Sequence, residues 1–278
     1  GVQLGEGPFQ FESVEAIAPS DEAKPVNPFV RLIGADRSLR KQVEQAKAAI
    51  LYPPDGLHTL IVGQTGVGKT LFAHLMFEYG KVMHRFAEDA PFVTFNCADY
   101  YNNSQLLISH IFGHMKGAFT GATADKKGYL DQADGGTLFL DELGEISLMG
   151  QVKLLRAIEH GGFTPVGGAQ IHRPDVRIIA ATNRDLLERV NEGAMRRDFY
   201  YRIHVIPIHL PPLRERKADI PLLVEHFLKA YPSNKRFEYM DSEMLHAFML
   251  YDWPGNVREL QNVLYQYLSL GTARLGDT

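Results

Sequence analysis

A glycine-rich octapeptide directly after a short apolar run constrains the fold of this chain more than any other feature. The run, residues 58–62, is rich in β-branched and apolar residues and predicts a buried parallel strand. The octapeptide, residues 63–70, has the spacing G-x-x-x-x-G-K-T, and the mostly apolar residues 71–77 predict a helix after it. A strand, a glycine loop and a helix in this order predict an α/β protein with a nucleotide phosphate at the start of the helix.

Each part of the octapeptide has a physical role in binding ATP. Glycines let backbone N–H groups close around phosphate oxygens, and the start of the helix adds partial positive charge. Lys69 is expected to reach the β- and γ-phosphates, and the Thr70 hydroxyl is expected to bind Mg²⁺. The alternative, an ordinary glycine-rich turn, is disfavoured by the flanking strand and helix. The residues predicted to bind nucleotide here are Gly63, Gln64, Thr65, Gly66, Val67, Gly68, Lys69, Thr70 and Leu71.

Polar side chains end two further apolar runs. Residues 135–140 lead into Asp141, which suits a metal holder, and Glu142, which suits a residue that orients the attacking water. An acidic turn is the alternative for this pair taken alone. Residues 176–181 lead to Asn183, at the carboxyl end of a predicted strand, where open α/β sheets bind ligands. Asn183 is therefore predicted to contact the γ-phosphate or the water, and its alternative role is to cap the next helix.

The hexapeptide Gly-Ala-Phe-Thr-Gly-Ala, residues 117–122, lies between the two halves of this predicted ATP site. Its small residues make it flexible, and it carries no acid, base or ligand for chemistry of its own. It can instead present Phe119 and Thr120 to a partner.

Composition limits the remaining possibilities. Of 278 residues, 45% are hydrophobic and 22% are charged, which is typical of a soluble globular protein. The net charge of −4 argues against a nucleic-acid surface, and no apolar run approaches the length of a membrane span. Cys97 is the single cysteine, in a predicted strand over residues 91–98, so it is expected to be a small buried hydrophobe rather than part of a disulfide framework. The eleven histidines show no zinc-ligand spacing.

Six motifs in this order resemble the AAA+ domain of bacterial enhancer-binding proteins, which activate sigma-54 RNA polymerase. The resemblance covers about residues 29–270 and implies a P-loop ATPase: a parallel sheet flanked by helices, with a small all-helical lid. It divides the chain into a linker or tail of a missing domain (1–28), a nucleotide-binding subdomain (29–209) and the lid (210–278). The motifs are residues 63–70, 117–122, 135–142, 181–183, 210–216 and 253–260.

The resemblance also implies roles for single residues of the ATP site. Asn96 matches an asparagine that pairs with Glu142 as a switch. Asn183 matches the first sensor, and Arg258 matches the second sensor, which reads the nucleotide from the lid. Ile33 is expected to approach the adenine, with plain core packing as its alternative.

Two arginines match residues donated across a subunit boundary, namely Arg196 and Arg202. A solvated or salt-bridged helix face is the alternative for this basic stretch. The chain departs from the family pattern at Arg197, which lies beside Arg196, so either of these two adjacent arginines could be the donated one. It departs again at His110, where many relatives carry a glutamate, and at Pro165, which replaces a commonly basic position in a second surface loop over residues 163–168.

The resemblance further implies a partner and an assembly. The expected function is a cytoplasmic, Mg²⁺-dependent ATPase ring that remodels the closed complex of sigma-54 RNA polymerase, and the family implies that the ring is a hexamer. Enhancer DNA would be bound only through a domain absent from this chain. The alternatives are an AAA+ machine acting on another client and a nucleotide-dependent scaffold without hydrolysis. The partner-binding residues implied are Gly117, Ala118, Phe119, Thr120, Gly121 and Ala122.

Overall fold

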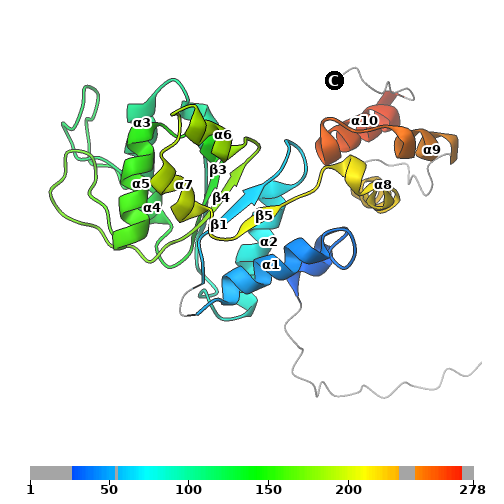
Figure 1. Cartoon of the computed structure of the whole chain (residues 1–278), viewed down its shortest axis with the longest axis horizontal. Helices are drawn as coiled ribbons and strands as arrows, with labels where there is room; N and C mark the ends of the chain where they lie inside the picture. The colour runs from blue at the N-terminus through cyan, green and yellow to red at the C-terminus, as the bar shows by residue number, and fades with distance from the viewer. Residues whose placement is uncertain (1–26, 54–55, 232–241, 271–278) are drawn as a thin grey trace, which may run out of the picture.

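The structure is a computed structural model that describes residues 27–53, 56–231 and 242–270. Its centre is a sheet of five parallel strands in the order β2-β3-β4-β1-β5 (Figure 1). Strands β3, β4 and β1 lie inside this sheet, and β2 and β5 form its edges. The strands are β1 (Thr59–Val62), β2 (Phe92–Asn96), β3 (Thr137–Asp141), β4 (Arg177–Thr182) and β5 (Pro207–His209).

Helices cover both faces of the sheet. Alternate residues of β4 point to opposite faces: Ile178 and Ala180 join a core with α3, α5 and α7, whereas Ile179 and Ala181 join a core with α1 and α2. Burial on both faces explains why the inner strands are apolar throughout. The helices of the described residues are α1 (Arg40–Leu51), α2 (Lys69–Val82), α3 (Ser104–Phe112), α4 (Tyr129–Gln132), α5 (Leu148–His160), α6 (Leu186–Asn191), α7 (Arg197–Ile203), α8 (Ile220–Ala230), α9 (Ser242–Leu250) and α10 (Asn256–Leu270).

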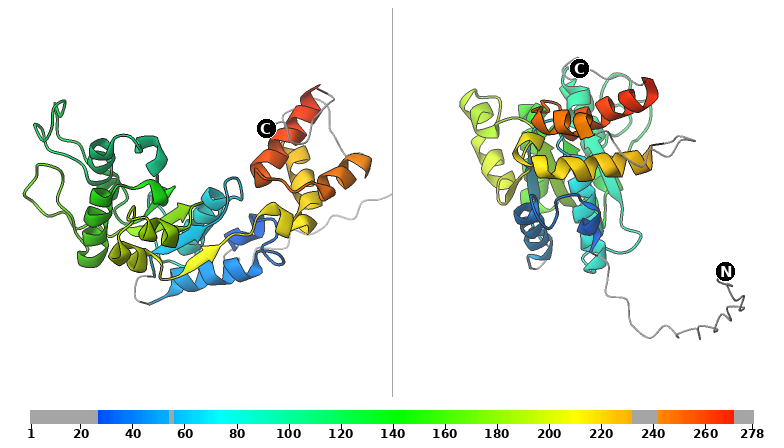
Figure 2. Two further views of the ribbon diagram at one scale, coloured as in Figure 1. Left: turned by 45° about the horizontal axis from the view of Figure 1, so that its top comes forward. Right: turned by 90° about the vertical axis from the view of Figure 1, so that its right-hand side faces the viewer.

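The last three helices form a lid with its own hydrophobic core. Trp253 is fully buried in that core, packs edge-on against Phe248, and donates from Nε1 to the Phe248 carbonyl at 2.8 Å. Ile33, from the segment before α1, also packs against the lid core. Two long loops project from the end of the α/β part farthest from the lid, between α3 and α4 and between α5 and β4 (Figures 1 and 2).

The predicted α/β fold with a helical lid is confirmed. The strand predicted over residues 91–98 ends at Asn96, because the Asn96 side chain caps a 3₁₀ helix, η2 (Cys97–Tyr100). The linker expected over residues 1–28 falls almost wholly outside the described residues. Within the described part, no helix is long and apolar enough to cross a bilayer.

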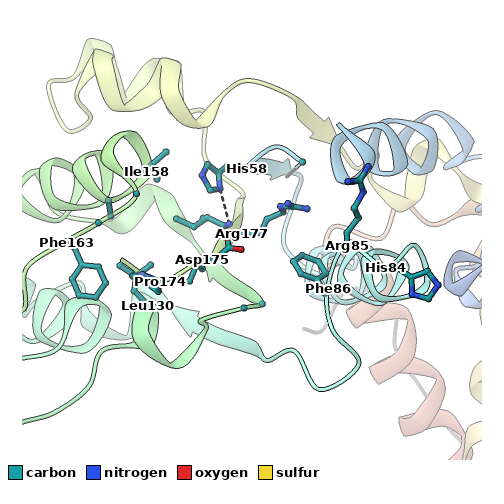
Figure 3. A pocket seen from close by; sticks show the side chains of 18 residues that line it. His58, His84, Arg85, Phe86, Leu130, Ile158, Phe163, Pro174, Asp175 and Arg177 are labelled. Atoms are coloured by element: carbon teal, nitrogen blue, oxygen red, sulfur yellow. Dashed lines mark hydrogen bonds between the residues drawn. The ribbon is translucent and has the colours of Figure 1, made fainter. Parts of the chain in front are cut away.

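A cavity of about 420 Å³ opens at the amino ends of the strands, opposite the edge where the glycine loop lies (Figure 3). Its lining includes His58, Phe86 and Arg177, whose guanidinium lies over the Phe86 ring at 5.1 Å. The Nδ1 atom of His58 accepts a hydrogen bond from the N–H of Ile178 at 3.1 Å. Burial, with smaller contributions from the charges of Arg177 and Arg202, lowers the pKa of His58 from 6.5 to about 4.

This lowered pKa predicts that acid destabilises the fold. The unfolded chain protonates His58 near pH 6.5, whereas the folded protein protonates it only near pH 4. The stability that depends on neutral His58 is therefore fully present above pH 6.5 and is lost as the pH falls towards 4. The loss amounts to at most about 3 kcal/mol. Urea unfolding at about pH 7 and about pH 5 measures it. In His58→Asn, whose Oδ1 can still accept from Ile178, the loss is expected to shrink, whereas the exposed-residue control His226→Ala keeps it. Equal losses in wild type and His58→Asn would contradict the assignment.

Candidate nucleotide-binding site

The glycine loop between β1 and α2 has a backbone that favours glycine at two positions. Gly66 has φ +79° and Gly68 has φ +106°, in the left-handed region. A side chain on Gly66 would also collide with the carbonyl oxygen of Gly255 in the lid. The loop therefore turns sharply from the carboxyl end of β1 into α2, whose first-turn N–H groups have no partner within the helix.

Lys69, the first residue of α2, is buried within this loop. Its Nζ atom donates to the carbonyl oxygen of Gly63 at 3.0 Å and lies 3.8 Å from Oε1 of Glu142. Only 7% of the Lys69 side chain is exposed, so the ammonium group is held in place at the mouth of the loop. Thr70 and Leu71, the next two residues of α2, are exposed beside it.

Strands β3 and β4 bring two more predicted residues to the same edge. Glu142 follows β3 with φ +49°, a conformation that costs a non-glycine residue about 1–2 kcal/mol. Its N–H donates to Oδ1 of Asp141 at 2.9 Å, which stabilises the turn. Oε2 of Glu142 accepts from the N–H of Asn183 at 3.4 Å, and Nδ2 of Asn183 donates to Oγ1 of Thr65 at 3.1 Å. The ammonium group of Lys69, the carboxylate of Glu142 and the side-chain amide of Asn183 thus converge on the glycine loop.

The alternative role of Asn183 as a helix cap is wrong. Oδ1 of Asp185 accepts hydrogen bonds from the N–H groups of Leu187 and Glu188, so Asp185 caps α6. This leaves the Asn183 side chain directed to the glycine loop.

Asn96 lies next to Asp141 in the sheet register but makes a different contact from the one expected. Its Nδ2 atom donates to Oδ1 of Asp99 at 2.8 Å, and its Oδ1 accepts from the N–H of Ala98 at 3.1 Å. The structure therefore brings Asn96 to the same edge as Glu142 without joining the two side chains, since Glu142 contacts Lys69 and Asn183 instead.

The oxygen ligands at this edge fit a metal ion that is shared with a nucleotide. The predicted holders are the Thr70 hydroxyl and the carboxylate of Asp141, which uses Oδ1 for the turn. The described residues contain no group of three or more His, Cys, Asp or Glu side chains that could hold a metal ion by themselves. Mg²⁺ suits such a sparse site, because it keeps several waters and takes further ligands from substrate phosphates.

The lid contacts the glycine loop through residues whose roles the sequence did not reveal. Asn256 is fully buried: its Oδ1 accepts from the N–H of Leu213 at 2.8 Å, and its Nδ2 donates to the carbonyl of Thr65 at 3.0 Å. Arg216 is also buried and donates to the carbonyl of Val67 at 2.8 Å. Both residues lie in motifs that the sequence singled out, but nothing local indicates their partners.

The predicted sensor of the lid lies beside this contact. The N–H of Arg258 donates to the Gly66 carbonyl at 3.3 Å, and the Arg258 side chain is exposed. Ile33 packs against the lid core, which agrees with its packing alternative and also places it at the junction of lid and α/β part.

The predicted trans arginines make their contacts away from the glycine loop. Arg196 holds Asp198 in a two-pronged ion pair, with distances of 3.0 and 2.7 Å, and this pairing lowers the pKa of Asp198. This is the salt-bridged surface that was the alternative. Arg202 donates to the carbonyl of Ile158 at 3.4 Å. In the described part of the chain, the exposed side chain of Arg197 makes no hydrogen bond or ion pair.

The hexapeptide forms the tip of the loop between α3 and α4. The N–H of Gly117 donates to the carbonyl of Ala122 at 2.8 Å, which closes a tight turn with Thr120 exposed. The Phe119 ring rests edge-on against His114 at 5.0 Å. The second loop supports this tip, because the N–H of Met115 donates to the Val166 carbonyl at 3.0 Å.

Comparisons with known proteins agree with this geometry. Residues 32–209 match the sigma-54 interaction domain, and residues 214–275 match the AAA+ ATPase lid domain. The chain is 45% identical over 218 residues to the DNA-binding transcriptional regulator NtrC of Rhizobium meliloti (strain 1021), covering 77% of this chain and 43% of that protein. It is 50% identical over 206 residues to the Nif-specific regulatory protein of Azotobacter vinelandii, covering 74% and 38%.

A solved structure has the same architecture and a bound nucleotide. NtrX from Brucella abortus in complex with ATP matches with a TM-score of 0.75 and 28% identity, covering 89% of this chain and 52% of that chain. The chain thus spans about half or less of the length of these proteins. The resemblance drawn from the six motifs is confirmed: the chain belongs to the sigma-54 interaction domain family, with an AAA+ ATPase lid domain after it.

Proposed function

We propose that this chain is a ring-forming, Mg²⁺-dependent ATPase that remodels the sigma-54 RNA polymerase closed complex through residues 117–122. The observation that carries the ATPase is the convergence of Lys69, Glu142 and Asn183 on the glycine loop. Family membership and the exposed tip of the loop support the choice of partner. The proposed location is the cytoplasm, and enhancer DNA would be bound by another part of a longer protein.

The site residues divide the chemistry among them. Lys69 neutralises charge on the β- and γ-phosphates, and Glu142 orients the attacking water and accepts its proton. Asn183 and Arg258 sense the γ-phosphate from the sheet and from the lid. Thr70 and Asp141 would hold Mg²⁺, which would supply positive charge to the phosphate group. Asn96 exchanges Asp99 for Glu142 when the nucleotide state changes, and this exchange moves the loop.

Glu142→Gln is expected to separate hydrolysis from binding. The amide keeps the size of the side chain but accepts no proton, so kcat should fall at least about 100-fold. Affinity for a fluorescent ATP analogue should stay within about threefold, since Lys69 and the loop are intact. Phosphate release and fluorescence titration measure the two quantities, with the exposed Glu159→Gln on α5 as the matched control. An equal loss of nucleotide binding would contradict the role of Glu142.

Mixing of two inactive variants tests the ring. Arg196→Ala keeps its own ATP site but donates no arginine, and Lys69→Ala binds no ATP but still donates Arg196. If the arginine acts across a boundary, phosphate release should reappear in the mixture and stay absent from each variant alone. The same mixing with Arg202→Ala tests the second arginine. If both mixtures form rings of wild-type size but release no phosphate, both arginines act within their own subunit.

Capture of purified sigma-54 tests the partner. We expect the chain to bind sigma-54 with ADP plus a metal-fluoride transition-state mimic and to release it with ADP alone. A nucleotide shifts the loop only if it binds the two loop conformations with different affinities. Absence of capture in every nucleotide state, with normal hydrolysis and ring formation, would assign the loop to another client.

Thr120→Ala is expected to abolish this capture while ATP hydrolysis stays within about twofold of wild type, because Thr120 lies outside the site residues. The matched control is Thr123→Ala, another exposed threonine just past the hexapeptide. Comparable losses of capture and hydrolysis in Thr120→Ala would refute the separation of chemistry from partner binding.

A further inference from the structure

Four rings fill the space between the tip of β2 and the loop that carries the hexapeptide. Phe95 stacks on Tyr100 with ring centroids 5.1 Å apart and planes 8° apart. Tyr100 contacts His110 at 5.0 Å, and His110 stacks on Tyr129 at 6.1 Å. Tyr129 contacts Phe95 at 5.2 Å, so each of the four side chains contacts two of the others. We call these four residues the aromatic bridge.

One end of the aromatic bridge is attached to the nucleotide edge of the sheet. Phe95 is the residue before Asn96, and Tyr100 ends η2, whose Asp99 holds the Asn96 side chain at 2.8 Å. If Asn96 leaves Asp99, the cap of η2 changes, because Oδ1 of Asn96 also accepts from the N–H of Ala98. Tyr100 is the large side chain of η2 that reaches back to the neighbouring helix.

The other end is attached to both stems of the hexapeptide loop. His110 lies in the last turn of α3, just before Gly113, and Tyr129 begins α4, just after Gly128. The two glycines are pressed together: a Cβ on Gly113 would lie 2.7 Å from the Gly128 nitrogen. His110 and Tyr129 therefore stack across the point where the loop leaves and re-enters the fold.

Packing, rather than hydrogen bonding, holds the His110 ring. Its Nδ1 atom is buried without a hydrogen-bond partner among the described residues. Burial, with smaller contributions from Lys126 and His114, lowers the pKa of His110, so the ring is neutral near pH 7. A flat neutral ring suits this position between two tyrosines.

We infer that His110 is a positioning residue that couples the Asn96 switch to the loop: its ring transmits movement of Tyr100 on η2 to Tyr129 and the paired loop stems. This inference rests on the proposed ATPase, but the coupling can be measured without sigma-54. Close-packed rings move together because a gap would lose the contacts of both neighbours. The tip itself turns at Gly117 and Gly121, whose left-handed backbone favours glycine, and its direction depends on the stems below it.

A fluorescent label at Thr123→Cys reports the coupling. Cys97 is fully buried, so labelling is expected at position 123 alone. With intact coupling, the emission differs between ADP and ADP plus metal fluoride. His110→Ala should reduce this difference about tenfold, because both ring contacts are lost, and leave kcat for ATP within about twofold. His110→Phe should restore the difference, which a merely structural loss would not explain. His226→Ala, a histidine against Phe227 in the lid, is the matched control.

Each outcome decides the inference. An unchanged emission difference in His110→Ala overturns the inference. The inference is also overturned if the labelled wild-type protein emits equally with ADP and with ADP plus metal fluoride. If His110→Ala unfolds, Tyr100→Leu keeps the apolar bulk but removes the stacking, and a normal emission difference in Tyr100→Leu also overturns the inference. A further result would be a label that reports the nucleotide only when the His110 ring is present, in a protein that captures no sigma-54. This result would uphold the coupling and refute the proposed partner.

Discussion

The turn of the glycine loop is the constraint on which the rest of the site depends. Its left-handed glycines let the chain pass from β1 into α2 while the lid backbone lies against Gly66. Asn256 and Arg216 donate hydrogen bonds to carbonyls of the glycine loop from the lid side. Lys69, the first residue of α2, donates to another carbonyl of the same loop. Sheet, helix and lid therefore meet at one short segment, so a ligand bound there contacts all three.

Charge at this edge is balanced by neighbours rather than by solvent. The buried ammonium of Lys69 faces Glu142, whose strained backbone is stabilised by Asp141 and whose carboxylate reaches Asn183. Such strain persists only where the surroundings define the conformation, and it is concentrated at functional sites. Parallel strands bring these groups together because their carboxyl ends share an edge.

The site proposed for ATP and the loop proposed for the partner are separated in space. The hexapeptide has no titratable group and projects far from the lid, while its stems are fixed by stacked rings and by the second loop. Under the proposed function, a rigid base below the tip would transmit a change at the strand ends without exposing the ATP site to the partner. Pro165 lies buried in the supporting loop, where its ring restricts the backbone.

The sequence by itself determined the strand, glycine loop and helix, the apolar strands with polar ends, and hence the fold class and the residues at the site, because these signals are periodicities and turns encoded within a few neighbouring residues. Only the tertiary structure decided the partners of those residues. Asn96 contacts Asp99 instead of Glu142, Asp185 takes the capping role from Asn183, and Asn256 joins the lid to Thr65 across 191 residues. The first two contacts join residues two or three positions apart, where several local hydrogen-bond patterns compete and the backbone conformation selects one. The Asn256 contact depends on how separate elements pack, and no local pattern encodes that packing.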